Sequence, residues 1–360
     1  MVDWRQGYSE FNDKKNVANA PTANSDLEEQ QDVNDFAIGG GHYCRACAHS
    51  VRIICPCRRA GAGENHIVVF GFPSLGAFMP PVIKAQKLDT AHGLDIEFVE
   101  RPPDAYTTQF NSGEFKVGGS AAVLTVGLAD ARGVKVKYLF NLFDFWGTVV
   151  TSRPEIKSVK DLEGKQLAAA SSTTNFVMFE FFAKKLGMDR SKVQVVNTAP
   201  PGLVGYALAD RADAIQLWEP AYTLLKTKKP SIQTLDTQIN KTWTTFAGGE
   251  RIPYLGVAAH SDWIEQNQAI IPRLYATYKE AADFITKHPE EAAALITPKS
   301  TPQDRAALVS LIKANDRLGM NVVPAGEVAK QIDAVYKAGV DVGYFKSPPS
   351  TDTIYVKSMK

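Results

Sequence analysis

The sequence predicts an α/β protein made of two units and a helical tail, on three observations. Short apolar or alternating runs recur from residue 66 onward, as expected for buried or half-buried strands. Amphipathic segments of helical spacing separate these runs, and such alternation favours open sheets with crossover helices. The pattern restarts after Trp146, and residues 261–344 are mostly helical in character. We therefore expect two lobes with a cleft between them.

The first unit is expected to begin with a buried parallel strand, because residues 67–72 (IVVFGF) form an apolar run. A loop and a helix follow, with Pro80 and Pro81 near the helix start, where proline is well tolerated. The remaining elements expected here are, in order, a strand (94–100), a helix, a turn (111–113), a short strand and a second helix (all within 107–133), and a strand (135–143).

The second unit repeats this organisation after Trp146. Its clearest segment runs from residue 159 to 220, where a strand-like run leads through a polar turn into an amphipathic helix. A turn at Gly248 and Gly249 precedes the last strand. The strands expected in this part lie, in order, at residues 148–153, 166–170, 194–200, 231–235 and 254–259.

Composition places the chain among ordinary globular proteins. Of its 360 residues, 44% are apolar and 22% are charged, and the formal net charge is +1. This balance creates no global field that would favour nucleic acid or an acidic membrane surface. No run approaches the roughly 18 apolar residues that a membrane span needs. We expect a soluble protein that does not bind nucleic acid.

A polar turn that opens a helix is the strongest functional signal in the residues themselves. It consists of Ser171, Ser172, Thr173, Thr174 and Asn175. Unpaired N–H groups and the positive end of the dipole at a helix start favour an anion or a strongly polar group. No catalytic base accompanies the turn, so we expect binding rather than reaction. Simple N-capping by serine or threonine is the structural alternative.

Ligands of open α/β sheets settle where loops leave the carboxyl ends of strands. Three predicted loops meet this condition, at residues 73–78, 118–122 and 171–175. Neither of the Gly-rich phosphate-binding motifs is present. The 6 histidines fall in no catalytic motif. These observations favour a binding protein over an enzyme.

Residues 1–64 differ from the rest of the chain. They begin with a polar stretch that cannot bury enough surface to become ordered, so we expect a disordered or weakly helical extension. All 4 cysteines lie in it, at Cys44, Cys47, Cys55 and Cys57. Three interpretations of these cysteines stay open: a zinc site, a disulfide, and an extension in which the cysteines are incidental. The last is favoured because the spacing fits no known zinc module. The apolar run in this region is too short for an export signal.

Four segments that follow one another in order resemble a known family. They are S-V-K-D-L-E-G-K at 158–165, K-L-G at 185–187, A-L-A-D-R-A-D-A at 207–214 and L-W-E-P at 217–220. With the polar turn, they make the chain from residue 66 to about 344 similar to the periplasmic substrate-binding proteins of ABC transporters in the nitrate, sulfonate and taurine class. The resemblance implies a two-lobed, hinged clamp of the type II periplasmic-binding-protein fold with a helical C-terminal part. It also implies no cofactor, no metal and no catalysis.

The resemblance also implies a division of the chain and a ligand site. The expected parts are an extension (1–64), a first lobe (65–144 with 254–360) and a second lobe (145–253). Ligand contacts are expected from the loop after the first strand, from a second loop, from a hinge crossing, and from an aromatic–acid pair that closes the cleft. These residues are, in that order, Ser74, Leu75 and Gly76; Ser120 and Ala121; Phe143 and Trp146; and Trp218 and Glu219. The aromatic residues among them have core packing as their structural alternative.

The function implied by the resemblance is capture of a small ligand and its delivery to a permease in the inner membrane. The ligand would be a sulfonate, taurine, a nitrate-like ion or a related polar compound, and the protein a periplasmic monomer. Two alternatives stay open: a ligand sensor, and an enzyme on the same fold, such as a pyrimidine-precursor synthase or a lyase. The enzyme is disfavoured because those enzymes use cysteines inside the fold, and no cysteine follows Cys57.

Overall fold

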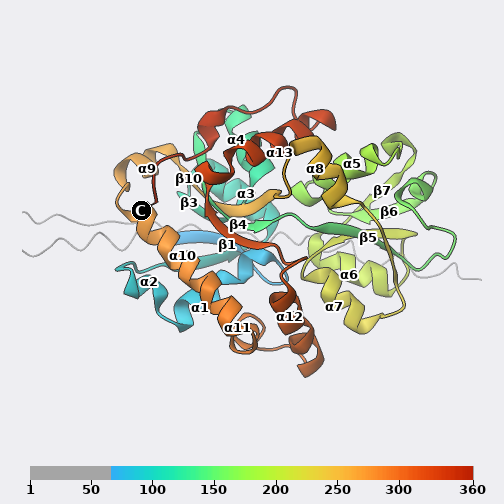
Figure 1. The fold of residues 1–360 in the computed structure, drawn as a ribbon, viewed down its shortest axis with the longest axis horizontal. Coiled ribbons are helices and arrows are strands. Elements are labelled where there is room, and N and C mark those ends of the chain that lie inside the picture. Colours follow the sequence, from blue (N-terminus) through green and yellow to red (C-terminus); the bar gives the residue numbers. More distant parts are fainter. Residues whose placement is uncertain (1–65, 360) are drawn as a thin grey trace, which may run out of the picture. The chain divides into compact units, whose positions relative to one another are not determined.

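The structure is a computed structural model, and it describes residues 66–359. Figure 1 shows these residues arranged around two β-sheets with helices packed on them. The predicted α/β class is confirmed. The extension expected at residues 1–64, with its cysteines, lies outside the described residues.

Sheet A contains six strands: β1 (His66–Phe70), β2 (Glu97–Arg101), β3 (Val117–Ala122), β4 (Val136–Asp144), β10 (Pro253–His260) and β11 (Met320–Pro324). Their order across the sheet is β11-β4-β10-β3-β1-β2. The strands β2 and β3 run parallel to β1, whereas β10 runs antiparallel to β3 and β4. The returning strand β10 therefore occupies the interior of the sheet, where all its residues are buried.

Helices cover both faces of sheet A. They are α1 (Met79–Ala85), α2 (Leu88–Ala91), α3 (Pro103–Ser112), α4 (Val123–Ala131), α9 (Ser261–Gln266), α10 (Ile270–Lys287), α11 (Pro289–Ile296), α12 (Pro302–Ala314) and α13 (Ala329–Asp341). In Figure 1, α4 and α13 lie on one side of the sheet, and α1 and α10 on the other. The sequence explains this layering in α10, because Ile271, Leu274, Tyr278 and Ile285 recur at helical spacing and are buried.

Sheet B contains five strands: β5 (Gly147–Thr151), β6 (Gln166–Ala169), β7 (Gln194–Asn197), β8 (Ala214–Trp218) and β9 (Gln233–Leu235). Their order is β7-β6-β8-β5-β9, with β6 parallel to its two neighbours and β5 antiparallel to its own. Helix α5 (Thr174–Lys185) packs on one face, and α6 (Pro200–Leu208) and α7 (Ala221–Lys228) pack on the other. Each face has its own apolar cluster.

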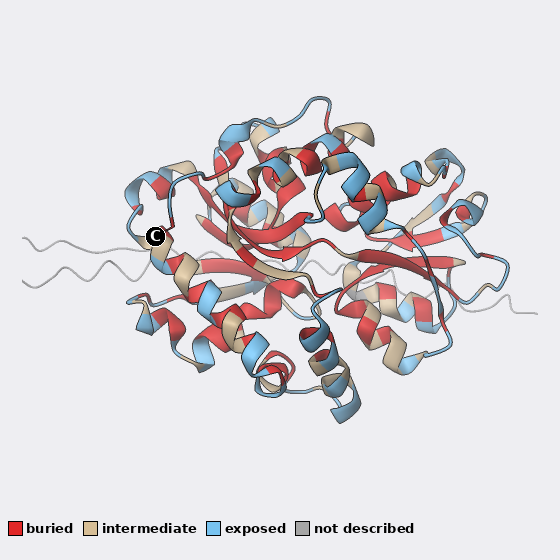
Figure 2. Cartoon of the chain, viewed as in Figure 1, coloured by how far each residue is buried: buried red, intermediate tan, exposed pale blue. Residues whose placement is uncertain are grey.

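The two sheets are joined by packed helices as well as by the chain. The chain passes from β4 to β5 through Phe145 and Trp146 and returns through α8 (Ile239–Ala247) to β10. Helix α8 packs against α5 and α13, and α12 packs against α7. Phe181 and Phe182 of α5 lie edge-on or tilted against Trp243 of α8. Figure 2 shows that the strands of both sheets are largely buried and that exposed residues concentrate on the outer helices and loops.

Residues 261–344 are mostly helical, as expected, and within them the short strand β11 (Met320–Pro324) interrupts the series of helices. Asn315 ends α12 with a positive φ of 53°. Its side chain then binds the backbone of Met320 twice, accepting from N at 2.8 Å and donating to O at 3.1 Å. This turn redirects the chain to the free edge of β4, where a short apolar run pairs as a strand.

The loop predicted at residues 118–122 is not a loop. These residues belong to β3, which pairs with β1 on one side and β10 on the other and passes directly into α4. Its glycines and alanines are small, which suggests a turn from composition alone. In the sheet, their small size lets bulky neighbours approach, as where a Cβ on Gly118 would lie 2.3 Å from the Tyr106 hydroxyl.

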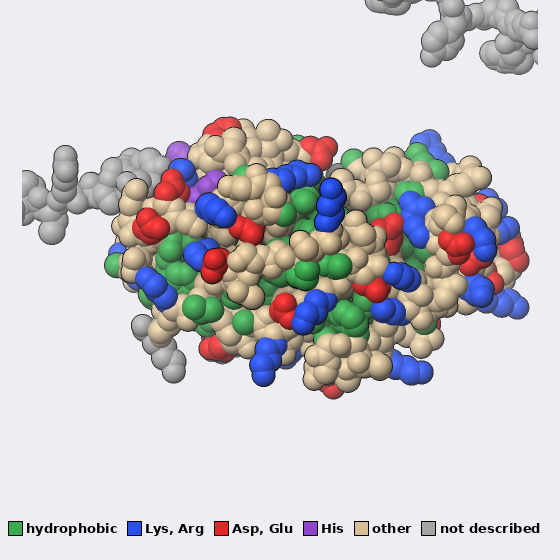
Figure 3. Space-filling model, turned by 90° about the horizontal axis from the view of Figure 1, so that it is seen from above, with side chains coloured by type: hydrophobic (Ala, Val, Ile, Leu, Met, Phe, Trp, Pro, Cys, Tyr) green, Lys and Arg blue, Asp and Glu red, His purple; other side chains and the backbone are tan. Residues whose placement is uncertain are grey.

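The surface carries no dominant charge on the face that Figure 3 presents, because basic and acidic side chains are intermixed there. This agrees with the formal net charge of +1. Among residues 66–359, no helix is both long enough and apolar enough to cross a membrane.

The close contact at Gly256 yields a stability prediction. A Cβ on this residue of β10 would lie 2.2 Å from the carbonyl oxygen of Phe140 in β4. We expect Gly256→Ala to lower the free energy of unfolding by about 1–3 kcal/mol, because the backbone must move to accept it. The matched control is Gly205→Ala in α6, which meets no atom within 4 Å and should stabilise by about 0.4–1 kcal/mol. Urea denaturation of both variants measures the difference, and equal effects would contradict the prediction.

Candidate functional site

The polar turn lies at the carboxyl end of β6, and the side chains of Ser171 and Thr173 have partners close by in sheet B and α5. The backbone N and the Oγ of Ser171 donate to Asn197 Oδ1, at 3.0 and 2.8 Å. Thr173 caps α5: its Oγ1 accepts from Phe176 N at 3.3 Å and donates to the carbonyl of Ala170 at 2.8 Å. Ser172 is exposed and makes no hydrogen bond with any described residue. Of these three side chains, that of Ser172 is the one free to meet a ligand.

The next two residues of the turn point inward. Thr174 is 4% exposed, and its hydroxyl has no partner among the described residues. Asn175 is 1% exposed, and its Nδ2 donates to the Tyr254 hydroxyl at 2.5 Å while its Oδ1 has no described partner. Tyr254 lies in β10, so this bond joins the start of α5, a helix that packs on sheet B, to sheet A. The hydroxyl of Tyr254 stays protonated at neutral pH, because burial raises its pKa well above the usual value.

A further polar side chain that the sequence reasoning missed lies beside this turn. Gln216 is fully buried, and neither its Nε2 nor its Oε1 has a partner among the described residues. Its neighbour Ile215 pairs with Ala168 in the parallel register of β8 and β6, so Gln216 lies next to the strand end from which the turn departs. In the sequence, this residue could have been noticed as a single glutamine within the otherwise apolar strand AIQLW at residues 214–218. Buried polar groups in native proteins nearly always have a partner, so the unpaired amide of Gln216 calls for an explanation.

Glu219 is held in an ionic and aromatic cluster. Its carboxylate accepts from the backbone N and the Oγ1 of Thr223, at 3.1 and 2.9 Å, and from Arg317 Nε at 2.9 Å. The guanidinium of Arg317 also lies over the rings of Trp146 and Tyr222, 5.9 and 5.7 Å from their centroids. The sequence predicted Glu219 and Trp146 as site residues, and the structure brings them together through Arg317. That arginine lies between α12 and β11 and could not be assigned to the site from the sequence.

Burial and hydrogen bonding to arginine shift the pKa values of the two buried acids of this region in opposite directions. Burial raises the pKa of Glu219 above its usual 4.5, and the hydrogen bonds from Arg317 and Thr223 oppose this rise. Asp144, at the crossing from sheet A to sheet B, also has a pKa raised by burial against the lowering effect of Arg251. Arg251 Nη1 lies 3.0 Å from Asp144 Oδ2. Both arginines are therefore already paired with carboxylates.

The residues predicted from the first two loops contact one another. Ser120 is fully buried, and its Oγ accepts from Phe70 N at 2.9 Å. A Cβ on Gly76 would lie 2.0 Å from the same Oγ. Leu75 and Ala121 are also buried, whereas Ser74 is half-buried and its Oγ accepts from Gly76 N at 3.3 Å. In this conformation, Ser74 is the member of this group with accessible surface for a ligand.

The aromatic residues predicted for the site are divided between core and surface. Phe143 is fully buried, and its ring lies edge-on to that of Phe78 at 5.9 Å. Trp218 is 8% exposed at the end of β8. Trp146 is half-buried, and its ring lies 5.2 Å from that of Tyr222. Packing therefore accounts for Phe143, whereas Trp146 can still cover a bound molecule.

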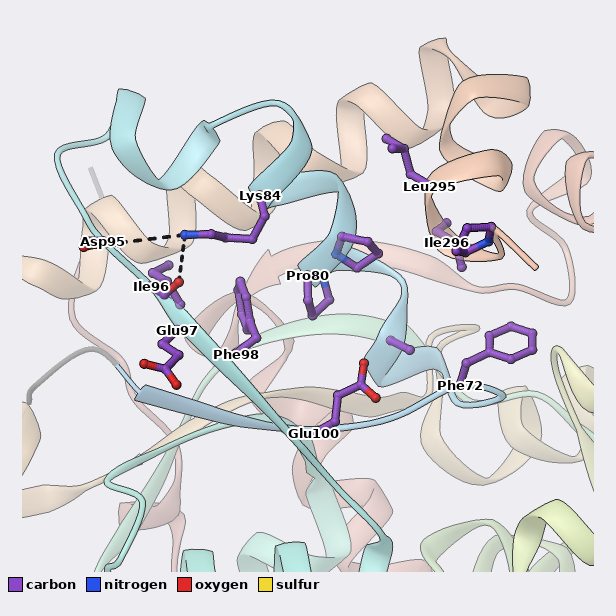
Figure 4. Close-up of a pocket in the computed structure, with 13 residues that line it drawn as sticks. Phe72, Pro80, Lys84, Asp95, Ile96, Glu97, Phe98, Glu100, Leu295 and Ile296 are labelled. Atoms are coloured by element: carbon purple, nitrogen blue, oxygen red, sulfur yellow. Dashed lines mark hydrogen bonds and ion pairs between the residues drawn. The ribbon is translucent and has the colours of Figure 1, made fainter. Parts of the chain in front are cut away.

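A cavity of about 620 Å³ lies elsewhere, between α1, β2 and the end of α11. Figure 4 shows Lys84 beside Asp95 and Ile96, with Phe72 on the opposite side of the cavity. None of the individually predicted site residues lines it, whereas Ala77 of the loop predicted at residues 73–78 does. Lys84 is paired with Asp89 at 2.6 Å and lies 3.8 Å from Asp95, so its charge is already compensated.

Titratable side chains suited to metal binding or base catalysis lie away from the polar turn. Within the described part of the chain, no three His, Cys, Asp or Glu side chains are grouped so as to hold a metal ion. His66 and His92 are paired with Glu97 and Glu280, at 3.0 and 2.8 Å. His260 binds the backbone of Phe110 at 2.6 Å. The turn therefore offers hydrogen-bonding groups for a ligand, whereas the histidines named here, all from the described residues, are engaged elsewhere.

Comparison with known proteins agrees with this architecture. The family described as NMT1/THI5 like matches residues 89–292. A Brucella abortus protein described as a binding protein is 24% identical over 288 residues, which cover 78% of this chain and 86% of that protein. Two of the similar solved structures are sulfonate-binding proteins by their descriptions. The periplasmic aliphatic sulphonate binding protein SsuA of Escherichia coli is 19% identical with a TM-score of 0.63, over 80% of this chain and 95% of that one. The alkanesulfonate-binding SsuA of Xanthomonas axonopodis pv. citri, bound to MOPS, is 17% identical with a TM-score of 0.65, over 82% and 98%. The periplasmic-binding-protein fold expected from the sequence is confirmed.

The pairing of Glu219 with Arg317 can be tested by removing the arginine. Arg317→Met keeps the apolar stem between the two rings but leaves a buried carboxylate with only Thr223 as partner. We expect the free energy of unfolding to fall by about 1–3 kcal/mol. Lys313→Met is the control, because Lys313 and Glu290 form an exposed pair that should contribute no more than about 1 kcal/mol. Equal small losses in the two variants, measured by denaturant unfolding, would show that the Glu219–Arg317 pair is not stabilising.

The same variant should respond to pH in a defined direction. A carboxyl whose pKa is higher in the folded than in the unfolded protein binds a proton on folding, so stability falls as pH rises between the two values. Without Arg317, the pKa of Glu219 should rise further. The loss caused by Arg317→Met should therefore be smaller near pH 5 than near pH 8. In a Glu219→Gln background this pH dependence should disappear, and its persistence there would assign it to another group.

Proposed function

The chain belongs to the NMT1/THI5-like family, and we propose that it is the solute-binding component of an ABC importer. The observation that carries the proposal is the start of α5. There, the exposed Ser172 and the buried Thr174 and Asn175, each with a polar atom that has no partner among the described residues, follow the carboxyl end of β6, a strand that pairs in parallel with both its neighbours. Such a strand end is where open α/β sheets bind small molecules. Binding is favoured over chemistry because the polar groups at this site are hydroxyls and amides.

The proposed mechanism is closure of two lobes on the ligand. In this proposal, the first lobe consists of residues 65–144 and 254–360, and the second lobe consists of residues 145–253. The crossings at residues 145–146 and 252–253 would serve as the hinge. A ligand that contacts both lobes favours the closed state by its difference in affinity for the two states. The closed form then presents the surface that a membrane permease binds.

The proposed ligand is a small polar or anionic organic compound. Sulfonates, taurine and nitrate-like ions are the first compounds to test, because two of the similar structures are sulfonate-binding proteins. Ser172 and the N–H groups that begin α5 would hold the polar head of the ligand. Trp146 would cover its remainder. We further propose a periplasmic location and a monomeric state for the protein.

A thermal-shift screen tests the proposal. Ser172→Ala should leave the unliganded melting temperature nearly unchanged, because this side chain has no partner, but should reduce the ligand-induced shift. Thr173→Ala should also remove a helix cap and about 1 kcal/mol of stability. Thr301→Ala is the matched control, because Thr301 caps α12 in the same way and lies outside the proposed site.

The outcomes separate the two classes of function. Stabilisation by one ligand class, lost in Ser172→Ala but kept in Thr301→Ala, supports a binding protein. Absence of any stabilising ligand, together with turnover of one of the screened compounds, would overturn the proposal in favour of an enzyme on the same fold.

A further inference from the structure

The cavity between α1, β2 and the end of α11 has the size of a site for a small molecule. Its volume of about 620 Å³ falls within the range of about 300–1,000 Å³ that is typical of ligand pockets. The apolar part of its lining includes Phe72, Ala77, Pro80, Ile96, Phe98 and Leu295. Phe72 is 43% exposed, so a large aromatic surface is accessible there. None of the lining residues belongs to α5 or to the polar turn, so the cavity is separate from the proposed solute site.

The position of β2 at one edge of sheet A explains why apolar side chains stay accessible in this cavity. Successive residues of a strand point to opposite faces, so Phe98 and Glu100 share one face of β2. The ring of Phe98 lies edge-on to that of Tyr278 in α10 at 6.4 Å, so this is the face on which α10 packs. Phe98 is nevertheless only partly buried, and Glu100 is exposed. The helices on this face therefore leave part of the edge strand uncovered beside α1.

The charged side chains of the cavity have an excess of carboxylates. Those in the lining are Lys84, Asp95, Glu97 and Glu100. The ammonium of Lys84 is engaged at 2.6 Å by Asp89, which is not part of the lining. Glu97 lies 3.0 Å from His66, whereas the carboxylate of Glu100 has no hydrogen bond or ion pair with any other described residue. The cavity therefore offers negative charge that the described residues do not fully compensate, including one carboxylate without a partner.

The unpartnered carboxylate of Glu100 lies among the aromatic side chains of the cavity. Its Oε2 is so close to Gly71 that a Cβ on that glycine would be 2.8 Å away, and Gly71 directly precedes Phe72. Figure 4 shows Glu100 between Phe98 on one side and Phe72 on the other. A carboxylate pairs with a cation, and the faces of aromatic rings attract one as well. Both features favour a positively charged ligand at this end of the cavity.

An organic cation fits this lining better than a metal ion does. Within the described part of the chain, no three acidic, histidine or cysteine side chains are grouped so as to hold a metal. A hydrated inorganic ion would also gain nothing from contact with the apolar walls. An amine or guanidinium attached to an aromatic or aliphatic body would use the carboxylate and the apolar surface together.

We infer that this cavity is a second binding site, which takes a small organic cation with an aromatic or aliphatic body. Glu100 pairs with the cationic group of the ligand, and Phe72 and Phe98 contact its body. Anions are discriminated against, because they would meet an excess of carboxylates. The inference goes beyond the proposed solute-binding function and does not depend on it.

The test compares three small molecules of similar shape on the full chain by isothermal titration calorimetry. At neutral pH, 2-phenylethylamine is a cation, 3-phenylpropionate is an anion and 2-phenylethanol is neutral. We expect the cation to bind about tenfold more tightly than the other two, and added salt to reduce this preference. Glu100→Gln should abolish the preference, whereas Phe72→Ala should weaken the amine and the alcohol alike. Glu265→Gln is the matched control, because it removes an exposed carboxylate of α9 that does not line the cavity.

Each outcome supports or overturns the second site. Equal binding of the three probes, no binding by any of them, or a preference for the cation that persists in Glu100→Gln would overturn the inference. The acidic side chains of β2 would then be explained as charges that keep an edge strand from pairing with another chain. Binding of the cation that is lost in Ser172→Ala but kept in Glu100→Gln would place it at the start of α5 and would also overturn the inference. Glu100 and Phe72 are exposed, so both variants should fold, which circular dichroism checks.

Discussion

The arrangement of this protein depends on one buried carboxylate, that of Asp144 at the end of β4. Arg251, Asn321 and Asn141 donate to it at 3.0, 3.1 and 3.2 Å. Its backbone N donates to the carbonyl of Gly319 at 2.7 Å. A buried charge is tolerated only when it is paired and hydrogen-bonded, so the three segments that supply these partners, β4, the residues before β10 and residues 319–321, must be in place together. They are the points at which the chain leaves sheet A, returns to it and adds its last strand.

A second buried carboxylate repeats this principle at the end of sheet B. Glu219 is satisfied by Thr223 on its own side and by Arg317, which follows α12. The C-terminal part of the chain therefore contributes to both sheets: Asn321 binds Asp144, and Arg317 binds Glu219. Aromatic packing of Trp146 and Tyr222 around the guanidinium adds to this connection. For a protein proposed to open and close, these contacts are the ones that its motion must keep or exchange.

The contrast with Gln216 gives the proposed ligand site its physical basis. Each of the two buried carboxylates has three hydrogen-bond donors, whereas the buried amide of Gln216 has no partner in the described part of the chain. Buried polar atoms of Tyr106, Trp263 and Tyr278 are also unpaired among the described residues, so an unpaired amide calls for a reason particular to its place. Binding offers such a reason, because polar groups left unpaired in the protein alone are available to a ligand.

The sequence by itself determined the α/β class, most strands and helices, the polar turn at residues 171–175 and the family, because these follow from local periodicity and from short motifs in fixed order. The tertiary structure alone decided how each site residue is used. Glu219 was predicted from its motif, but Arg317, its counter-ion, is 98 residues away in the chain. Residues 118–122 were misassigned as a loop because pairing with distant strands overrode their local pattern, and such pairing also produces the strand Met320–Pro324 in a mostly helical part of the chain. Whether a polar side chain is exposed like Ser172, capped like Thr173 or buried without a partner like Gln216 depends on neighbours that only the folded chain brings together.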